Sequence, residues 1–300
     1  MTSVSAVALL VSVAAALACG QRSEANAAQT QALLAQRQAE ITQRLAAAGR
    51  DQKQTEPVAM WVLPAELREI SGLALTADGR VLTHDDEIGR VYVIDPKRGV
   101  VLKRFTLGDG PRGDFEGITV ADSSIYLLAS NGILLEFREG ADGASVPYSI
   151  HDTKLGHECT FESVAFEASS ASLLLPCKVV GKKSLRDQLV IYRWHVRKTD
   201  SPRLSMFTVP LTRVIGTNDW KTFHPSDMTV DPTTGNWVLI SSHEKGLVEV
   251  TPSGQVLRSG PLPGKHHQPE GVTITRDGIL IVSDEATKTP ATITLYRWRS

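Results

Sequence analysis

The chain has 300 residues, of which 42% are hydrophobic and 22% are charged, and its formal net charge is −1. This balance is that of a globular protein with a sizeable core, in one large domain or two small ones. Because the sequence has neither a basic excess nor a basic run, nucleic acid is not expected as a partner.

The first nineteen residues, MTSVSAVALLVSVAAALAC, form an uncharged apolar run of signal-peptide length. The run resembles a bacterial lipoprotein signal, in which cleavage falls between Ala18 and Cys19 and a lipid on Cys19 holds the mature protein on a membrane. Gly20, in place of an Asp, favours the outer membrane, with the protein facing the periplasm. A secretory signal without lipid and an uncleaved anchor are the alternatives.

Residues 20–57 are expected to connect the signal to the folded domain. Residues 21–50 are rich in Ala, Gln, Arg and Glu and contain no Pro, which predicts a helix. Its apolar stripe of Leu34, Ile41, Leu45 and Ala48 is short, so a spacer is favoured over a docking helix. A polar linker over 51–57 precedes the predicted main domain, residues 58–300.

From Val58 onward, short runs rich in Val, Ile, Leu and Thr alternate with turn residues about every ten positions, a pattern typical of an all-β domain. One phrase recurs as ISGLAL, FEGITV, FESVAF, PSDMTV and PEGVTI. Aligned on Ser71, Glu116, Glu162, Ser226 and Glu270, the copies lie 45, 46, 64 and 44 residues apart. An interval near 45 is that of a four-stranded propeller blade.

The blade count follows from the two ends of this region. The last unit lacks one strand, and VAMWVL, residues 58–63, has no unit of its own, so we expect it to complete the last blade. SVPYSI, residues 145–150, is expected as an outer strand of the second blade. The sequence therefore predicts a five-bladed β-propeller, or a six-bladed one if the insertion after Cys177 contains a degenerate unit.

In a propeller the first strand of every blade lines the central channel, so the five recurring phrases converge at one mouth. This gathers Glu116, Glu162 and Glu270, with Asp86, Asp227 and Glu285 nearby. Clustered carboxylates repel one another unless they take up protons or a cation. Ca²⁺, which prefers many oxygen ligands, is the predicted cofactor. Alternatively, each acid caps a turn or pairs with a local base such as Arg112 or Lys265.

Histidines are expected near the same face. His84, His157, His224, His243 and His267 precede first strands or follow second strands. They could bind a transition metal, or His224 or His267 could act as a general base beside calcium. Their spacing contains no zinc motif, so a purely solvated role also remains open.

Two further cysteines follow Cys19. Cys159 lies before the first strand of the third blade and Cys177 at the end of its second strand. Since export permits disulfides, they are predicted to form a bridge, with two buried free thiols as the alternative.

At the recurring phrases, and over about residues 58–300, the chain resembles the SdiA-regulated family and, more distantly, NHL-repeat propellers. HPSDMTVDPTTGNWVLISSHEKGLVEVTPSGQV and QPEGVTITRDGILIVSDE also carry the resemblance. It implies a five-bladed propeller, a calcium site, an exported or membrane-tethered location and no established enzymatic activity. Glu116, Glu162 and Glu270 match the family's E-G-[IV] acids, whereas Ser163 and Asp227 replace the usual Gly.

These observations predict a lipid-tethered, calcium-binding propeller that binds an envelope protein or ligand. The alternatives are a calcium-dependent esterase or lactonase with a rim histidine as base, and a scaffold with a purely structural acid ring.

Overall fold

The computed structural model describes residues 55–196 and 203–298, together with isolated positions between 29 and 43. The chain divides into two compact units, residues 1–47 and 48–300. In the first unit, the described positions are helical, within the segment where a helix is predicted. The predicted signal, including Cys19, lies outside the described residues. Within the described part of the chain, no helix has the length and apolar character needed to cross a membrane.

The second unit is a five-bladed β-propeller, which confirms the predicted fold class. The first blade contains β2 (Ile70–Leu75), β3 (Val81–Asp85), β4 (Arg90–Asp95) and β5 (Val100–Leu107). The second contains β6 (Phe115–Ala121), β7 (Ser124–Ala129), β8 (Ile133–Phe137) and β10 (Tyr148–Asp152). The third contains β11 (Cys159–Phe161), β12 (Ala165–Glu167), β13 (Ser172–Val180), β14 (Gln188–His195) and β15 (Leu204–Pro210).

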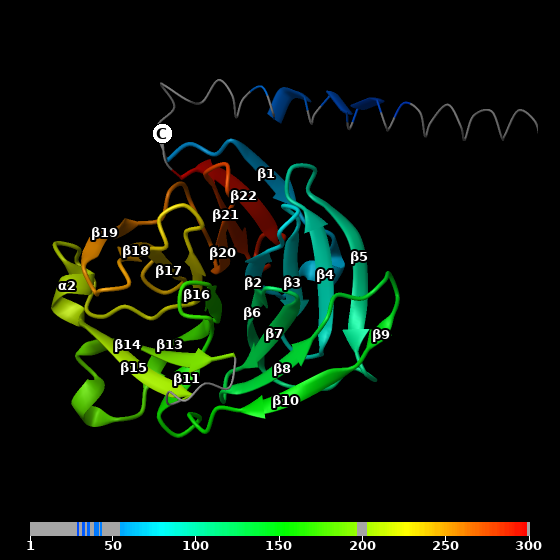
Figure 1. Cartoon of the computed structure of the whole chain (residues 1–300). Coiled ribbons are helices and arrows are strands. Elements are labelled where there is room, and N and C mark those ends of the chain that lie inside the picture. The colour runs from blue at the N-terminus through cyan, green and yellow to red at the C-terminus, as the bar shows by residue number, and fades with distance from the viewer. Residues whose placement is uncertain are drawn as a thin grey trace, which may run out of the picture. The chain divides into compact units, whose positions relative to one another are not determined.

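The fourth blade contains β16 (Asp227–Val230), β17 (Trp237–Ser241), β18 (Gly246–Val250) and β19 (Val256–Pro261). The fifth contains β20 (Pro269–Ile274), β21 (Ile279–Asp284), β22 (Thr292–Arg297) and β1 (Ala59–Val62). The innermost strands form a closed ring, since β2 contacts β20 and β6, β12 contacts β6 and β16, and β16 contacts β20. Figure 1 shows β2, β6, β16 and β20 at the centre of the propeller.

The ring is closed as the sequence predicts, because β1 pairs antiparallel with β22 and completes the last blade. The backbone N–H of Val58 and of Leu63 donates to Leu295 and Ala291 at the two ends of this pairing. The six-bladed alternative is wrong: the insertion after Cys177 continues β13 to Val180 and then forms only a short 3-10 helix, η2 (Lys183–Leu185). Two more short helices, η1 (Ala65–Leu67) and α2 (Leu211–Ile215), lie outside the sheets.

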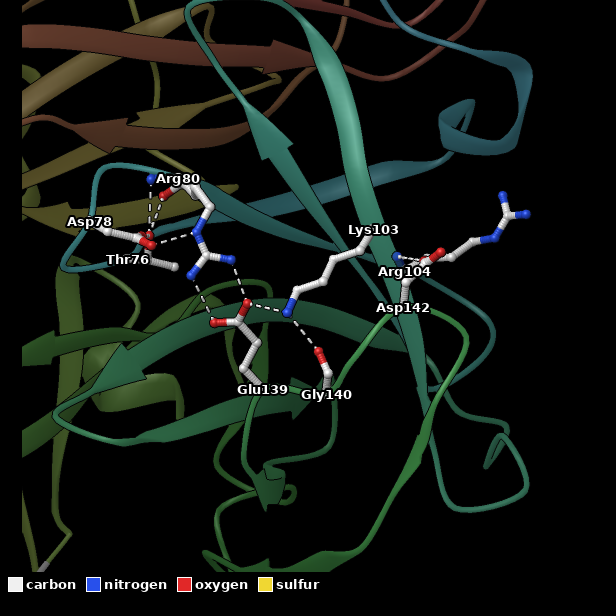
Figure 2. Close-up of polar contacts among 8 residues, drawn as sticks. All are labelled: Thr76, Asp78, Arg80, Lys103, Arg104, Glu139, Gly140 and Asp142. Carbon is white, nitrogen blue, oxygen red and sulfur yellow. Dashed lines mark hydrogen bonds and ion pairs between the residues drawn. The ribbon is translucent and has the colours of Figure 1, made fainter.

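The segment predicted as one outer strand of the second blade is divided between two blades. β9 (Ser145–Val146) pairs in parallel with β5 of the first blade, and β10 belongs to the second. Pro147 separates them, since a proline has no N–H to donate to a continuing ladder. Figure 2 shows how the chain before β9 is held to the first blade: the Glu139 carboxylate pairs with Arg80 (2.5 Å) and Lys103 (2.7 Å).

The hydrophobic core lies between neighbouring blades and holds them together by burial of apolar surface. Phe105 and Phe137 pack between the first two blades and Trp194 between the second and third. Trp237, fully buried, lies between the third and fourth blades, and Tyr296 between the fourth and fifth. Each first strand is thereby fixed relative to the next, which sets the positions of the side chains at the channel mouth.

Candidate functional site: an acidic pocket at the channel mouth

A pocket of about 190 Å³ opens where the innermost strands begin. Four blades contribute its lining, which is made of Glu69, Ser71, Asp86, Glu116, Glu162, Lys178, Gln268, Glu270 and Glu285. The fourth blade does not line the pocket, and at the repeat position where three other blades have glutamate it has a serine. That residue, Ser226, is buried and donates a hydrogen bond to the Pro269 carbonyl (2.8 Å). The structure therefore brings Glu116, Glu162 and Glu270 from three different blades into one cavity.

β-bulges place two of these acids at the mouth. In β6 the pairing with β7 shifts between Phe115 and Gly117, and in β20 the pairing with β21 shifts between Pro269 and Gly271. Glu116 and Glu270 are the extra residues at these shifts. A bulge residue is released from the regular alternation of the ladder and can be turned toward a site.

The glycine after the acid lets the innermost strands approach closely. A Cβ atom on Gly117 would lie 2.8 Å from the backbone N of Val164 in the next blade. A Cβ atom on Gly271 would lie 2.7 Å from the Leu73 side chain in the neighbouring first blade. Any larger residue at these glycines would push the blades apart. In each Glu-Gly sequence, the glutamate therefore lines the pocket and the glycine allows the inner strands to pack closely.

The pocket carries more acid than its one cation can neutralise. Burial, followed by the charge of Glu162, raises the pKa of Glu116 to about 8 and that of Glu270 to about 7. Burial also raises the pKa of Glu162, although Lys178 forms an ion pair with its carboxylate and opposes this rise.

A second group of acids, at the first and fifth blades, continues the pocket. Burial and the neighbouring charge of Glu69 raise the pKa of Asp86 to about 6, and both also raise that of Glu285. One carboxylate oxygen of Asp86 is buried without a hydrogen-bond partner. The Glu285 carboxylate accepts a hydrogen bond from Gln268 (2.6 Å). An unpartnered buried carboxylate oxygen is the kind of group that a cation or a proton satisfies.

The prediction that the Asp227 carboxylate lies in the acid ring is wrong. Asp227 is buried beneath the pocket and does not line it. Its carboxylate accepts hydrogen bonds from the backbone N–H of Val272 (2.6 Å), Met228 (2.8 Å) and Leu73 (3.2 Å), and from the Ser163 hydroxyl (2.8 Å). Burial nevertheless raises its pKa to about 7. Ser163 and Asp227, the two residues that depart from the E-G pattern, are thus joined by a hydrogen bond between the third and fourth blades.

Two charged lining residues were not predicted. Glu69 directly precedes the first recurring phrase, and Lys178 directly follows Cys177 in a second strand. The sequence could have indicated both residues, because a residue next to a strand end that reaches the channel mouth must also lie near that mouth. The strand β13 runs past Cys177 to Val180, so Lys178 is held by the sheet and not by a loop.

The histidines do not share one location. His84 is fully buried, its Nε2 has no hydrogen-bond partner, and burial lowers its pKa to about 4. His157 and His267 are exposed. His224 and His243 lie together on the fourth blade, where each Nδ1 contacts Oε1 of Glu244 at 3.0 Å and 2.8 Å. His224 is near enough to Glu162 for its charge to oppose the rise in the pKa of that acid, although neither histidine lines the pocket.

Cys159 and Cys177 form a disulfide that joins β11 to β13, with their Cα atoms 5.5 Å apart. The bond closes the segment that contains Glu162. It therefore restrains the part of the third blade that carries this acid.

Comparison with known proteins gives a match to one family model over part of the chain, and a similarity in fold. Residues 213–297 match the model of the SdiA-regulated family. This match confirms the resemblance predicted from the sequence over the part of the chain that contains β16 to β22. Glu270, Glu285 and His224 lie within the matched residues, whereas Glu116 and Glu162 precede them. No curated protein matches the chain.

Two solved structures illustrate the fold. The PQQ-bound aldose sugar dehydrogenase from Streptomyces coelicolor has a TM-score of 0.50 and 12% identity, covering 79% of this chain and 98% of that protein. A luciferin-regenerating enzyme also has a TM-score of 0.50, with 10% identity, covering 80% of this chain and 95% of that protein. At these identities the similarity concerns the propeller fold alone.

Proposed function

We propose that this protein is a calcium-binding propeller whose acidic pocket serves to bind a ligand, without chemistry of its own. The observation that carries the proposal is a single cavity with six carboxylates, from Glu69, Asp86, Glu116, Glu162, Glu270 and Glu285, against one cation, Lys178. A hard divalent cation relieves this repulsion, and carboxylate oxygens with water are the ligands that Ca²⁺ prefers.

The spacing of the acids in the pocket suggests how the ion would be held. Among the described residues, only His224, His243 and Glu244 bring three candidate ligand atoms within 4.8 Å of one another. The acids of the pocket are spaced more widely, so water is expected to complete the coordination of an ion there. Calcium tolerates such a shell because its coordination number and geometry vary, whereas magnesium requires a tighter octahedron.

Calorimetric titration of the chelator-treated protein with Ca²⁺ at pH 8 tests this proposal. Glu116→Gln and Glu162→Gln should each weaken binding at least roughly tenfold, the loss seen when even an outer-shell partner is removed from a metal site. Glu87→Gln is the matched control, because Glu87 is exposed at the same end of the first blade and does not line the pocket. Absence of Ca²⁺ binding, or equal binding by all three variants, would refute the proposal.

The hydrolase alternative is retained as a second candidate because of one contact. The His224 imidazole is held by Glu244 beside the acid pocket, which is the arrangement of an oriented base, whereas His267 is exposed. A screen of small esters and lactones with the wild type and His224→Ala separates the candidates. Calcium-dependent turnover that is lost in the variant would favour the hydrolase.

We further propose export to the cell envelope and a lipid anchor at Cys19. The apolar segment before Cys19 supports this, and so does the Cys159–Cys177 disulfide, since such bonds persist in oxidising compartments. Metabolic labelling with a fatty acid tests the anchor. The label should appear on the wild type and not on Cys19→Ala, and an unlabelled wild type would contradict it.

A further inference from the structure

The fourth blade carries a cluster of metal-ligand side chains that differs in chemistry from the acidic pocket. His224, His243 and Glu244 place one nitrogen of each imidazole and one carboxylate oxygen within 4.8 Å of one another. We propose that these three residues bind a divalent transition-metal ion, with zinc as the ion that fits best. The inference does not depend on calcium binding in the acidic pocket.

The carboxylate of Glu244 is oriented for this role. Its Oε2 accepts hydrogen bonds from the Ser241 hydroxyl and from the backbone N–H of His224 (3.0 Å). Its Oε1 faces both imidazoles. One oxygen is therefore held by the protein while the other is presented to the histidines, which is how outer-shell partners fix a metal ligand.

Glu244 is also shielded from solvent, since its side chain is only 4% exposed. A shielded carboxylate beside two imidazoles is the donor set typical of zinc, and not of calcium, which prefers oxygen ligands only.

The backbone around the cluster is fixed before any ion arrives. Phe223, which directly precedes His224, is buried and packs against Trp220 with ring centroids 5.7 Å apart. Trp220 in turn covers Gly246, where a Cβ atom would lie 2.5 Å from the indole ring. The segment that carries His224 is therefore pressed onto the start of β18, next to the turn that carries His243 and Glu244.

The distances are close to those of a zinc site. Zn²⁺ binds imidazole nitrogen and carboxylate oxygen at about 2.0–2.2 Å, so neighbouring ligand atoms in a tetrahedral site are about 3.4 Å apart. The nitrogen-to-oxygen distances here are 3.0 Å for His224 and 2.8 Å for His243. Entry of the ion requires the imidazoles to move outward by about half an ångström. The side chain of His243, at 77% exposed, is free to do so.

Three protein ligands leave a fourth position for water or for a group of a bound molecule. Because His243 is exposed, that position is accessible from solvent. Coordination through Nδ1 would use the same nitrogen that now contacts Glu244. A metal-loaded His224 would therefore be a ligand and could not serve as the base of the hydrolase alternative.

Titration of the chelator-treated full chain with Co²⁺, followed by Zn²⁺, tests the proposal. We expect about one Co²⁺ per chain, with the visible absorption of a four-coordinate site, and its displacement by Zn²⁺. His243→Ala should abolish this absorption and weaken Zn²⁺ binding at least roughly tenfold. The exposed position of His243 makes this variant safe for folding, and a circular dichroism melting curve verifies it. His267→Ala, which removes an exposed histidine outside the cluster, should retain the wild-type spectrum.

Glu116→Gln locates the ion. It should keep the Co²⁺ spectrum, and an excess of Ca²⁺ should not displace the ion, whether or not the acidic pocket binds calcium. The proposal is overturned if the wild type gives no four-coordinate spectrum, if His243→Ala binds Zn²⁺ as tightly as the wild type, or if Glu116→Gln loses the ion while His243→Ala keeps it.

Discussion

Asp227 occupies the repeat position at which three other blades have glycine and one has Ser163. Its carboxylate reaches the backbone N–H of Leu73 in the first blade and of Val272 in the fifth. These are the residues directly after Gly72 and Gly271. One buried carboxylate therefore joins the first, third, fourth and fifth blades, and its role is structural.

Asp227→Ala should lower the free energy of unfolding by about 2–5 kcal/mol, because it leaves buried N–H groups without an acceptor. For a domain of this size the thermal midpoint would fall by roughly 6–15 °C, measured by circular dichroism. Asp109→Ala, at an exposed carboxylate, is the control. A midpoint within about 1 °C of the wild type would show that Asp227 does not hold the blades together.

The sequence predicts the positions of three pocket glutamates correctly and the position of Asp227 wrongly. The recurrence of Glu before Gly predicts that Glu116, Glu162 and Glu270 converge, because the repeat period fixes their place on successive blades. The same argument placed Asp227 among them, although it stands one position later and so points below the mouth. The hydrogen bond between Ser163 and Asp227 depends on how two non-adjacent segments pack, which no repeat spacing records.

Among the elements, β1 is the one that completes the last blade. It has four residues and forms the outer edge of the fifth blade, whose other strands come from the far end of the sequence. This pairing was predicted because the last unit lacks a strand. The division of residues 145–150 between two blades was not, because β propensity identifies a strand but does not show which sheet it joins.

Removal of β1 should destabilise the whole propeller, because the fifth blade would lose a strand and the ring its closure. We expect a chain that begins at residue 64 to melt at least 10 °C below one that begins at residue 55, which corresponds to a loss of about 3 kcal/mol or more. Differential scanning calorimetry of the two chains checks this. Equal midpoints would mean that β1 contributes nothing to closure.

At the scale of the whole molecule, the acidic pocket makes stability depend on pH. Glu116 and Glu270 have pKa values of about 8 and 7 in the folded protein, above the ordinary value of 4.5. The folded chain therefore binds more protons than the unfolded chain in this window, and stability must fall as pH rises through it. The sign is opposite to that of a carboxylate held by a salt bridge.

We expect the thermal midpoint of the metal-free protein to fall between pH 5 and pH 8.5. In Glu116→Gln the fall should be smaller by about 2–6 °C, because the neutral amide no longer loses a proton in this range. Scanning fluorimetry at half-unit pH steps in the presence of a chelator measures both curves. Parallel curves for the variant and the wild type would show that Glu116 does not contribute to the pH dependence of stability.

The propeller, its five blades and its closure were predictable because a repeat of about 45 residues repeats the same hydrophobic pattern. His224 and His243 were expected near the same face, but their convergence on Glu244 was not predicted. The three are ordinary polar residues at two separate turns, and only the packing of Trp220 and Phe223 brings those turns together. The positions of the acids therefore follow from the repeat, whereas the positions of His224 and His243 follow from local packing.

The calcium content of the purified protein, measured by elemental analysis after dialysis against calcium, tests the central claim most directly. The account predicts about one calcium ion per chain, removed by a chelator and restored by added Ca²⁺, and absent from a variant with Glu116, Glu162 and Glu270 all changed to Gln. A wild-type protein that emerges from dialysis without calcium, or a triple variant that retains as much as the wild type, would contradict it.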